Sequence, residues 1–312
     1  MRSIVRCKYV EGRANQLDVE AIDVRFQGLE RVICCWRVGD VLVDPGPESS
    51  LGTLLAALGD ARPRGLLLTH IHLDHAGATG ALVRRWPDLE VYVHERGAPH
   101  VIDPGKLLAS AGRLYGEERM AALWGEVLPV PAERIHALTG GETIALGGGG
   151  RFRVAYTPGH ASHHVAYLHE ESGRAFVGDV AGVRIPPAEL TLAPTPPPDI
   201  DVEAWDRSLD LIADWRPAAL ALTHFGGIDA VAEQLDATRA SLHELAALAR
   251  DGDAASVIAA VRGRVEAAGD GPLRAAYAAA VPPEHIQQGL DRYWRKRADR
   301  EAGGDSSRVH SA

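Results

Sequence analysis

Apolar positions near the start of the chain follow the two-residue period of β-strands. Val19 to Phe26, Arg31 to Val38 and Val41 to Asp44 are rich in β-branched residues, and Gly28 and Gly39-Asp40 supply turns between them. This pattern predicts antiparallel strands joined by hairpins. A helix is then expected from Glu48 to Leu58.

The middle of the chain predicts a second group of strands after a mixed stretch. In that stretch Gly65 to Thr69 and Glu90 to His94 are typical of strands, whereas Ala76 to Trp86 and residues 103 to 124 are typical of helices. Glycine-rich segments then separate four further strands, which are expected to be antiparallel: Glu142 to Leu146, Arg151 to Thr157, His163 to His169 and Arg174 to Gly178.

The last third of the chain is mainly helical in character. An amphipathic helix from Asp201 to Trp215 and a buried strand from Ala218 to Thr223 precede it. We therefore predict a first domain of residues 1–228, a helical subdomain of 229–300 and a disordered tail of 301–312. The helical subdomain follows the first domain with almost no linker, so we expect it to pack on the site edge and complete the pocket.

Composition restricts the partners that we expect. The chain has 312 residues, 46% hydrophobic, with a formal net charge of -9, which favours a small-molecule substrate over nucleic acid. No stretch resembles a signal peptide or a membrane span, so we expect no membrane partner and a cytoplasmic location. Both a monomer and a homodimer are compatible with the sequence. Cys7, Cys34 and Cys35 are expected to be small buried residues rather than a disulfide framework.

One short segment concentrates side chains that bind metals. His70, His72, Asp74 and His75 follow the strand predicted at Gly65 to Thr69. In an extended segment residues i and i+2 point the same way, so His70 and His72 are aimed at one point, and Asp74 and His75 could serve a second. Imidazole and carboxylate suit zinc and similar divalent ions. This segment predicts a metal site.

Three other predicted strands are each followed by a residue that can also bind a metal. His160 follows Thr157-Pro158-Gly159, Asp179 follows Gly178, and His224 follows Thr223. Residues at strand ends are commonly presented as a site by a rigid sheet. Asp44 is either a turn residue or a support for the histidine loop. The proline-rich segment 184–199 either forms a wall of the site or is a surface excursion, and we interpret His94 and His100 as surface or capped residues.

Taken together and in this order, these motifs resemble the metallo-β-lactamase-fold hydrolase superfamily, over roughly residues 19 to 228. The resemblance implies an α/β fold, an αββα sandwich with the site at one edge, here with an added C-terminal helical subdomain. It also implies that His70, His72 and His160 bind one metal ion. Asp74, His75 and His224 would bind a second, with Asp179 bridging the two.

The same resemblance implies a hydrolase that uses a metal-bridging hydroxide on a small ester, thioester, lactone or phosphoester. Two divalent ions are expected, zinc first, with iron or manganese as alternatives. Asp74 is the candidate catalytic residue, as a proton shuttle. The competing hypothesis is a persulfide-dioxygenase-like oxidoreductase that holds one iron at His70, His160 and Asp179, because two histidines and a carboxylate suit ferrous iron.

The chain departs from several relatives at defined positions. Secreted zinc β-lactamases place cysteine at the position of Asp179, and quorum-quenching lactonases carry tyrosine just after it, where this chain has Val180 to Val183. His163 stands where the superfamily has a glycine, which predicts an altered wall of the site at this position. Glyoxalase II relatives bind glutathione through basic residues of a helical domain, but a solvated helix end explains Arg292, Arg295, Lys296 and Arg297 equally well.

Overall fold

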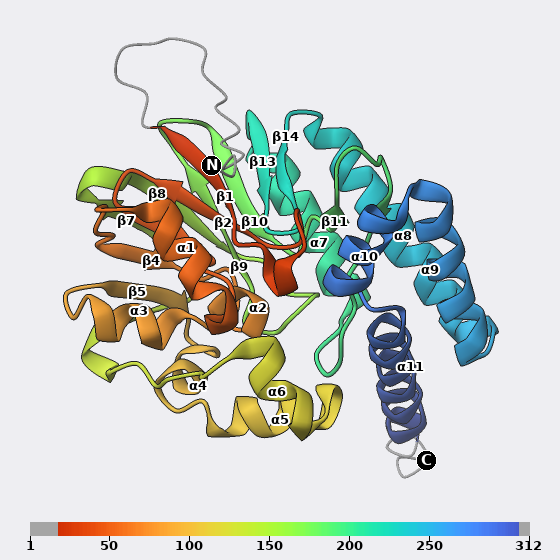
Figure 1. Ribbon diagram of the computed structural model, residues 1–312. Coiled ribbons are helices and arrows are strands. Elements are labelled where there is room, and N and C mark those ends of the chain that lie inside the picture. Colours follow the sequence, from red (N-terminus) through yellow and green to blue (C-terminus); the bar gives the residue numbers. More distant parts are fainter. Residues whose placement is uncertain (1–17, 306–312) are drawn as a thin grey trace, which may run out of the picture.

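The computed structural model describes residues 18–305 and consists of two β-sheets packed face to face with helices outside them (Figure 1). The first sheet has the strand order of the sequence: β1 (Val19–Asp23), β2 (Cys34–Val38), β3 (Val41–Val43), β4 (Gly65–Leu67), β5 (Glu90–His94) and β6 (Ile135–Leu138). β1 to β3 are antiparallel, as predicted, and β3 to β6 are parallel.

In the second sheet, the four strands that come first in the sequence are antiparallel neighbours, and the next strand pairs in parallel with the last of these four. Its order is β14-β13-β10-β9-β8-β7, and β13 pairs with β10 in parallel. The strands are β7 (Thr143–Leu146), β8 (Gly150–Tyr156), β9 (Val165–His169), β10 (Arg174–Gly178), β13 (Ala219–Leu222) and β14 (Gly226–Ile228). The αββα architecture expected from the sequence is confirmed.

Side chains alternate between the two faces of each strand, so the sheets divide the apolar core into a cluster between the sheets and a cluster under the helices. Cys34 belongs to the apolar cluster between the sheets and Cys35 to the cluster under the helices, and both are buried free thiols. This agrees with the prediction for these two residues, because neighbouring residues of a strand face opposite sides. Cys7 lies outside the described residues.

The helices lie on the outer faces and at the edge of the sandwich (Figure 1). α1 (Leu51–Leu58) and α3 (Thr79–Arg85) belong to the first half, with α4 (Ala98–Ile102), α5 (Gly105–Tyr115) and α6 (Glu117–Trp124) below it. α7 (Val202–Asp214) leads to the C-terminal group: α8 (Val231–Asp251), α9 (Ala254–Ala268), α10 (Gly271–Ala280) and α11 (Pro283–Asp305). Short helices complete the chain: η1 (Phe26–Gly28), η2 (Glu48–Ser50), α2 (Leu73–Ala76), η3 (Ala132–Arg134) and η4 (Gly147–Gly149).

Several predicted boundaries differ from the structure. The first strand ends at Asp23 instead of Phe26, because the Asp23 carboxylate accepts hydrogen bonds from the backbone N–H groups of Arg25 and Arg31, at 2.9 and 2.8 Å, and turns the chain. α11 continues to Asp305, past the boundary predicted at residue 300, and the rest of the predicted tail lies outside the described residues.

Two strands of the large sheets and one small two-stranded ribbon were not predicted. β6 is half exposed, and β14 is rich in glycine, so neither has the apolar alternation that identifies a strand. The proline-rich segment contains a small ribbon, β11 (Val183–Arg184) paired with β12 (Thr191–Leu192). Among residues 18–305, no helix is both long enough and apolar enough to cross a membrane.

Candidate metal centre

The predicted ligand residues all follow the carboxyl ends of strands that meet at one edge of the sandwich. β3 and β4 run parallel, and so do β10 and β13, while β8 lies one antiparallel strand beyond β10. These strands therefore end at the same edge, which brings together residues more than 150 positions apart in sequence, namely His70 and His224. The helix after β4 begins at Leu73, earlier than predicted, so Asp74 and His75 lie in its first turn.

Two glycines allow the motif loops to pack closely. At Gly159, with φ +137°, a Cβ atom would lie 2.4 Å from the Trp205 Cα atom, and at Gly178, with φ +48°, a Cβ atom would lie 2.5 Å from the Thr69 hydroxyl oxygen. Both positions therefore require glycine for backbone conformation and for space. Each glycine directly precedes a candidate ligand, His160 or Asp179.

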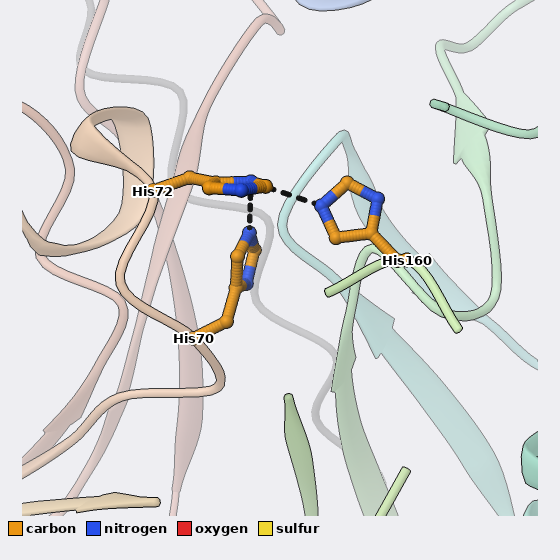
Figure 2. A group of neighbouring side chains, drawn as sticks. All are labelled: His70, His72 and His160. Carbon is orange, nitrogen blue, oxygen red and sulfur yellow. Dashed lines mark hydrogen bonds between the residues drawn. The ribbon is translucent and has the colours of Figure 1, made fainter. Parts of the chain in front are cut away.

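The first group of ligands consists of three imidazoles (Figure 2). His72 Nδ1 lies 2.9 Å from His70 Nε2 and 3.0 Å from His160 Nε2. Burial lowers the pKa of His70 well below its ordinary value, lowers that of His72 to about 3, and also lowers that of His160. The three rings are therefore neutral at physiological pH, which is the form that binds a metal.

The second group combines Asp74, His75 and His224. Asp74 Oδ2 lies 3.3 Å from His224 Nε2 and 3.8 Å from His75 Nε2. Asp179 lies between the two groups: its Oδ1 atom is 3.2 Å from His75 Nε2, and its Oδ2 atom is 3.4 Å from His160 Nε2. One carboxylate oxygen thus faces each group, the arrangement expected of a bridging ligand.

Several buried donor atoms of this centre lack well-aligned hydrogen-bond partners, and metal ions would supply the missing partners. His75 Nε2, His224 Nε2 and Asp179 Oδ1 are buried and have no well-aligned hydrogen-bond partner within residues 18–305. Unpaired buried polar atoms are costly in a folded protein, and three of them converge here. Imidazole nitrogen and carboxylate oxygen are suitable ligands for zinc and for iron, so the donor set by itself does not select the metal.

In two of the candidate ligands, the ring nitrogen that faces away from the centre donates a hydrogen bond to a backbone carbonyl, which orients the ring. His160 Nδ1 lies 2.8 Å from the Pro194 carbonyl oxygen, and His224 Nδ1 lies 2.6 Å from the Val32 carbonyl oxygen. A carbonyl can only accept, so each Nδ1 donates, and Nε2 is the nitrogen that can bind a metal. The sequence motifs gave no indication of Val32 or Pro194, because any residue supplies a carbonyl.

Asp44 is a support for the histidine loop as well as a turn residue. It is fully buried at φ +50°, and its carboxylate accepts hydrogen bonds from Thr69 N, Thr69 Oγ1 and Thr223 Oγ1 at 2.7 to 2.8 Å. Its Oδ2 atom also lies 2.8 Å from His75 Nδ1. Asp44 therefore joins the ends of β3, β4 and β13 and orients one ligand ring.

Other histidines of the sequence have supporting or unrelated places. His164 is buried beside Thr157, with Nδ1 2.8 Å from the Thr157 hydroxyl oxygen, and His163 lines the cavity beside the centre. His94 is not a surface residue: it is buried and stacks on Tyr156 with ring centroids 4.4 Å apart. His100 lines the same cavity as His163.

A cavity of about 1220 Å³ opens onto the centre at His72, Asp74, Asp179 and His224. Its walls come from α5 and α6 on one side and from α10 and α11 on the other, with residues 194–199 of the proline-rich segment between them. The C-terminal helices therefore take part in the pocket, as expected. Of the four basic residues considered there, Arg292 lines the cavity, while Lys296 donates to the Pro198 carbonyl and Arg297 pairs with Glu203.

The two groups of ligands differ in the protons that they hold without metal. Burial alone would lower the pKa of His75, but the negative charges of Asp179, Asp74 and Asp44 raise it well above its ordinary value. Burial alone would also lower the pKa of His224, but the negative charges of Asp179 and Asp74 raise it above its ordinary value. A metal ion at the second group must displace these protons, whereas the first group holds none to displace.

We therefore predict that lowering the pH from about 8 to about 6 releases the ion of the second group first, since each displaced proton costs about tenfold in affinity per pH unit. The affinity of the first group should change little over this range. Zinc titrations against a chromophoric chelator at several pH values measure both affinities. Equal pH slopes for the two ions would contradict the prediction.

α11 reaches His160 through the proline-rich segment. Thr195 Oγ1 donates to the Ile286 carbonyl at 3.2 Å, and the adjacent Pro194 carbonyl holds His160. The contact depends on Gly289, where a Cβ atom would lie 1.8 Å from the Thr195 carbonyl oxygen. A side chain there must displace the segment that orients a ligand.

Gly289→Ala is therefore expected to lower the free energy of unfolding by roughly 1–3 kcal/mol, as overpacking does, and to weaken metal binding at the first group. Thermal unfolding and zinc titration measure the two effects. Gly263→Ala in α9 is the matched control, because a Cβ atom there would meet nothing within 4 Å. If Gly289→Ala bound zinc as tightly as Gly263→Ala, the proposed path from α11 to His160 would be wrong.

Comparison with known proteins gives a family match that spans the candidate site. The sequence profile of the metallo-beta-lactamase superfamily matches residues 39–224, which include all seven candidate ligands. The metallo-beta-lactamase fold-containing protein ST1585 of Sulfurisphaera tokodaii is 29% identical over 215 residues, 67% of this chain and 77% of that protein. A hydroxyacylglutathione hydrolase of Legionella pneumophila is 28% identical over 137 residues, 44% of this chain and only 41% of that enzyme.

Solved structures show the same fold. The crystal structure of ST1585, from Sulfolobus tokodaii, superposes with a TM-score of 0.65 at 22% identity, covering 87% of this chain and 97% of that one. The BLEG-1 B3 metallo-beta-lactamase gives a TM-score of 0.54 at 22% identity, covering 72% and 99%. At these identities the likeness concerns the fold alone.

Proposed function

This chain belongs to the metallo-beta-lactamase superfamily, and on that premise we propose that it is a hydrolase with two divalent metal ions, zinc first among them. The substrate bond is an ester, thioester, lactone or phosphoester. The observation that carries the proposal is the position of Asp179, whose two oxygens face two separate groups of buried ligands. Its relatives include a hydroxyacylglutathione hydrolase, which supports a hydrolytic reaction.

His70, His72 and His160 would hold one ion, Asp74, His75 and His224 the other, and Asp179 both. Bound there, the ions supply a hydroxide near neutral pH and polarise the oxygen of the substrate bond. The protein orients the ligand rings through Asp44, Val32 and Pro194 and provides a cavity that opens beside them. The supporting contacts hold the site ready before the substrate enters.

Asp74 is suited to move a proton. Its side chain is 22% exposed, whereas those of His75 and Asp179 are 0% and 6% exposed, so it is the more accessible of the two carboxylates that line the cavity. Burial would raise the pKa of Asp74, but the positive charge of His75 holds it below its usual range. Asp74 is therefore ionised at neutral pH, and its cavity-facing oxygen can accept a proton and return it to the leaving group.

Asp74→Asn is expected to lower kcat by about 10²-fold, the usual contribution of one general acid–base group. Asparagine keeps one oxygen as a ligand but cannot carry the proton. Metal content must be measured on the same sample, so that a loss of the second ion is recognised. Full kcat in Asp74→Asn with both ions retained would show that another group moves the proton.

The alternative with a single iron at His70, His160 and Asp179 is less well supported. It would leave the Nε2 atoms of His75 and His224 buried without a metal ion and, within residues 18–305, without a well-aligned hydrogen-bond partner. A protein interior rarely keeps two such atoms unpaired. A second ion beside Asp74 satisfies both.

Metal analysis of protein purified without added metal, followed by hydrolysis assays on esters, thioesters and phosphodiesters, tests the proposed function. We expect two divalent ions per chain and an activity that a chelator removes and zinc restores. One iron per chain, with oxygen uptake on glutathione persulfide and no hydrolysis, would establish the alternative.

A further inference from the structure

The cavity beside the metal centre has a wall that is far more cationic than the rest of the chain. Apart from the candidate ligands, its charged residues are two acids, Asp199 and Glu284, and five bases: Arg96, Lys106, Arg113, Arg119 and Arg292. The whole chain has the opposite balance, with 33 Lys and Arg against 42 Asp and Glu. The excess of positive charge is thus a local property of this wall.

The two acids do not neutralise these bases. Glu284 pairs with Arg262 at 2.5 Å, and Asp199 accepts a hydrogen bond from Ser162 at 2.6 Å. Within residues 18–305, Lys106, Arg113 and Arg119 have no ion pair or side-chain hydrogen bond. Their charges are available to a ligand in the cavity.

Helix α5 arranges its part of this wall in two adjacent rows. Lys106, Ser110 and Arg113 follow one another at helical spacing, and all three line the cavity. Leu107, Ala111 and Leu114, each one position further on, line it as well. Positions three, four and seven apart lie on one face of a helix, so a polar row runs beside an apolar one. The seven steps from Lys106 to Arg113 span about 10 Å at 1.5 Å per residue.

The size of the cavity indicates a bulky ligand. Its volume of about 1220 Å³ exceeds the roughly 300–1,000 Å³ of common small-molecule sites. Two cations about 10 Å apart along the helix, Lys106 and Arg113, are more than one carboxylate needs. The apolar row and the neighbouring aromatic residues Phe26 and Trp124, stacked with centroids 5.4 Å apart, give the same ligand an apolar surface.

We propose that the substrate is a bulky anionic thioester or ester, whose phosphate or carboxylate groups are bound by Lys106 and Arg113 on α5. The scissile carbonyl then lies at the end of the cavity next to His72 and Asp74. Unpaired cations in a partly enclosed cavity attract anions and form charge-assisted hydrogen bonds with them. This inference rests on the proposed function for its chemical step, but not for the binding of the anion.

The step is a hydrolysis. Water supplies the oxygen that forms the new bond to the carbonyl carbon, the carbon–sulfur bond breaks, and the thiol leaves with a proton. Neither an oxidant nor another co-reactant is consumed. The anionic groups take no part in the reaction and serve to hold the substrate.

The test compares four thioesters on the zinc-loaded full chain. S-butyryl-N-acetylcysteamine is the neutral reference. Butyryl-coenzyme A carries phosphates, S-butyrylglutathione carries carboxylates, and S-glutaryl-N-acetylcysteamine carries its charge on the acyl side. We expect at least one anionic thioester to exceed the reference by tenfold or more in kcat/KM, and the preferred one identifies the anion.

The double variant Lys106→Gln/Arg113→Gln should remove that preference by raising KM for the anionic thioester. Arg84→Gln/Arg207→Gln makes the same change of charge at exposed positions that do not line the cavity, and should behave as the wild type. Equal preference in both double variants, or no preference in the wild type, would overturn the proposal.

A binding measurement separates this proposal from the proposed function. Butyl-coenzyme A and S-butylglutathione are thioethers that cannot be hydrolysed, and calorimetry reports their affinities. Tenfold weaker binding to Lys106→Gln/Arg113→Gln than to the control variant supports the anion site, even if no thioester is turned over. If both thioethers fail to bind the wild type and the glutaryl thioester is not preferred, the anion site is overturned, even if the neutral thioester is hydrolysed.

Discussion

Replacing Asp179 with alanine is expected to lower kcat/KM by at least about 10³-fold, a loss of roughly 4 kcal/mol of transition-state stabilisation. Asp179 faces the first group through Oδ2 and the second through Oδ1, and its side chain is only 6% exposed. No neighbouring side chain can replace both oxygens, because the remaining ligands already belong to one group or the other. The variant should therefore bind both ions more weakly.

Metal content after gel filtration and kcat/KM in excess zinc measure the two parts of this effect. Asp88→Ala is the matched control, since the side chain of Asp88 is fully exposed and remote from the centre, and it should retain both ions. If Asp179→Ala kept two tightly bound ions, Asp179 would not bridge them. If it lost the ions but kept its activity, hydrolysis would not depend on this centre.

The second large effect is expected at Asp44, which contacts no substrate. Asp44→Ala removes the acceptor of Thr69 N, Thr69 Oγ1 and Thr223 Oγ1 and leaves His75 Nδ1 without a partner. Removing one member of a buried, hydrogen-bonded charged pair costs about 3–5 kcal/mol of folding stability. Loss of the contact that orients His75 should also weaken the second ion by about 10–100-fold.

Thermal unfolding of the metal-free protein and zinc titration at the second group test the two effects separately. Asp60→Ala is the matched control at an exposed position and should alter neither. A variant of Asp44 that unfolds and binds zinc as the control does would show that the turn at Asp44 needs only its backbone conformation.

The sequence by itself identified the candidate ligands because their chemistry is local. His70, His72, Asp74 and His75 lie within six positions, and such spacing on a strand-to-helix loop has few structural explanations other than a metal site. The αββα fold followed from the order of strand and helix patterns together with the resemblance. Strand periodicity also placed Cys34 and Cys35 on opposite faces of a sheet, as the structure shows.

The tertiary structure decided which of these local signals act together. The support of His75 by Asp44 joins residues 31 positions apart, and the Val32 carbonyl that orients His224 is 192 positions away. Periodicity is silent on such contacts, because they depend on which strand ends meet after the sheets pack. For the same reason His94, a lone histidine in the sequence, was expected to be a surface or capped residue and is buried against Tyr156.

The cavity wall is the clearest case of this division. Lys106, Arg113 and Arg119 are ordinary solvated residues by sequence, in a chain whose net charge is -9. Only the packing of α5 and α6 opposite α10 and α11 turns them toward a common space beside the candidate metal ligands. The sequence thus determined the chemistry at the strand ends, where a short motif specifies it. The structure determined the pocket, since a cavity exists only between segments that long-range burial of apolar surface brings together.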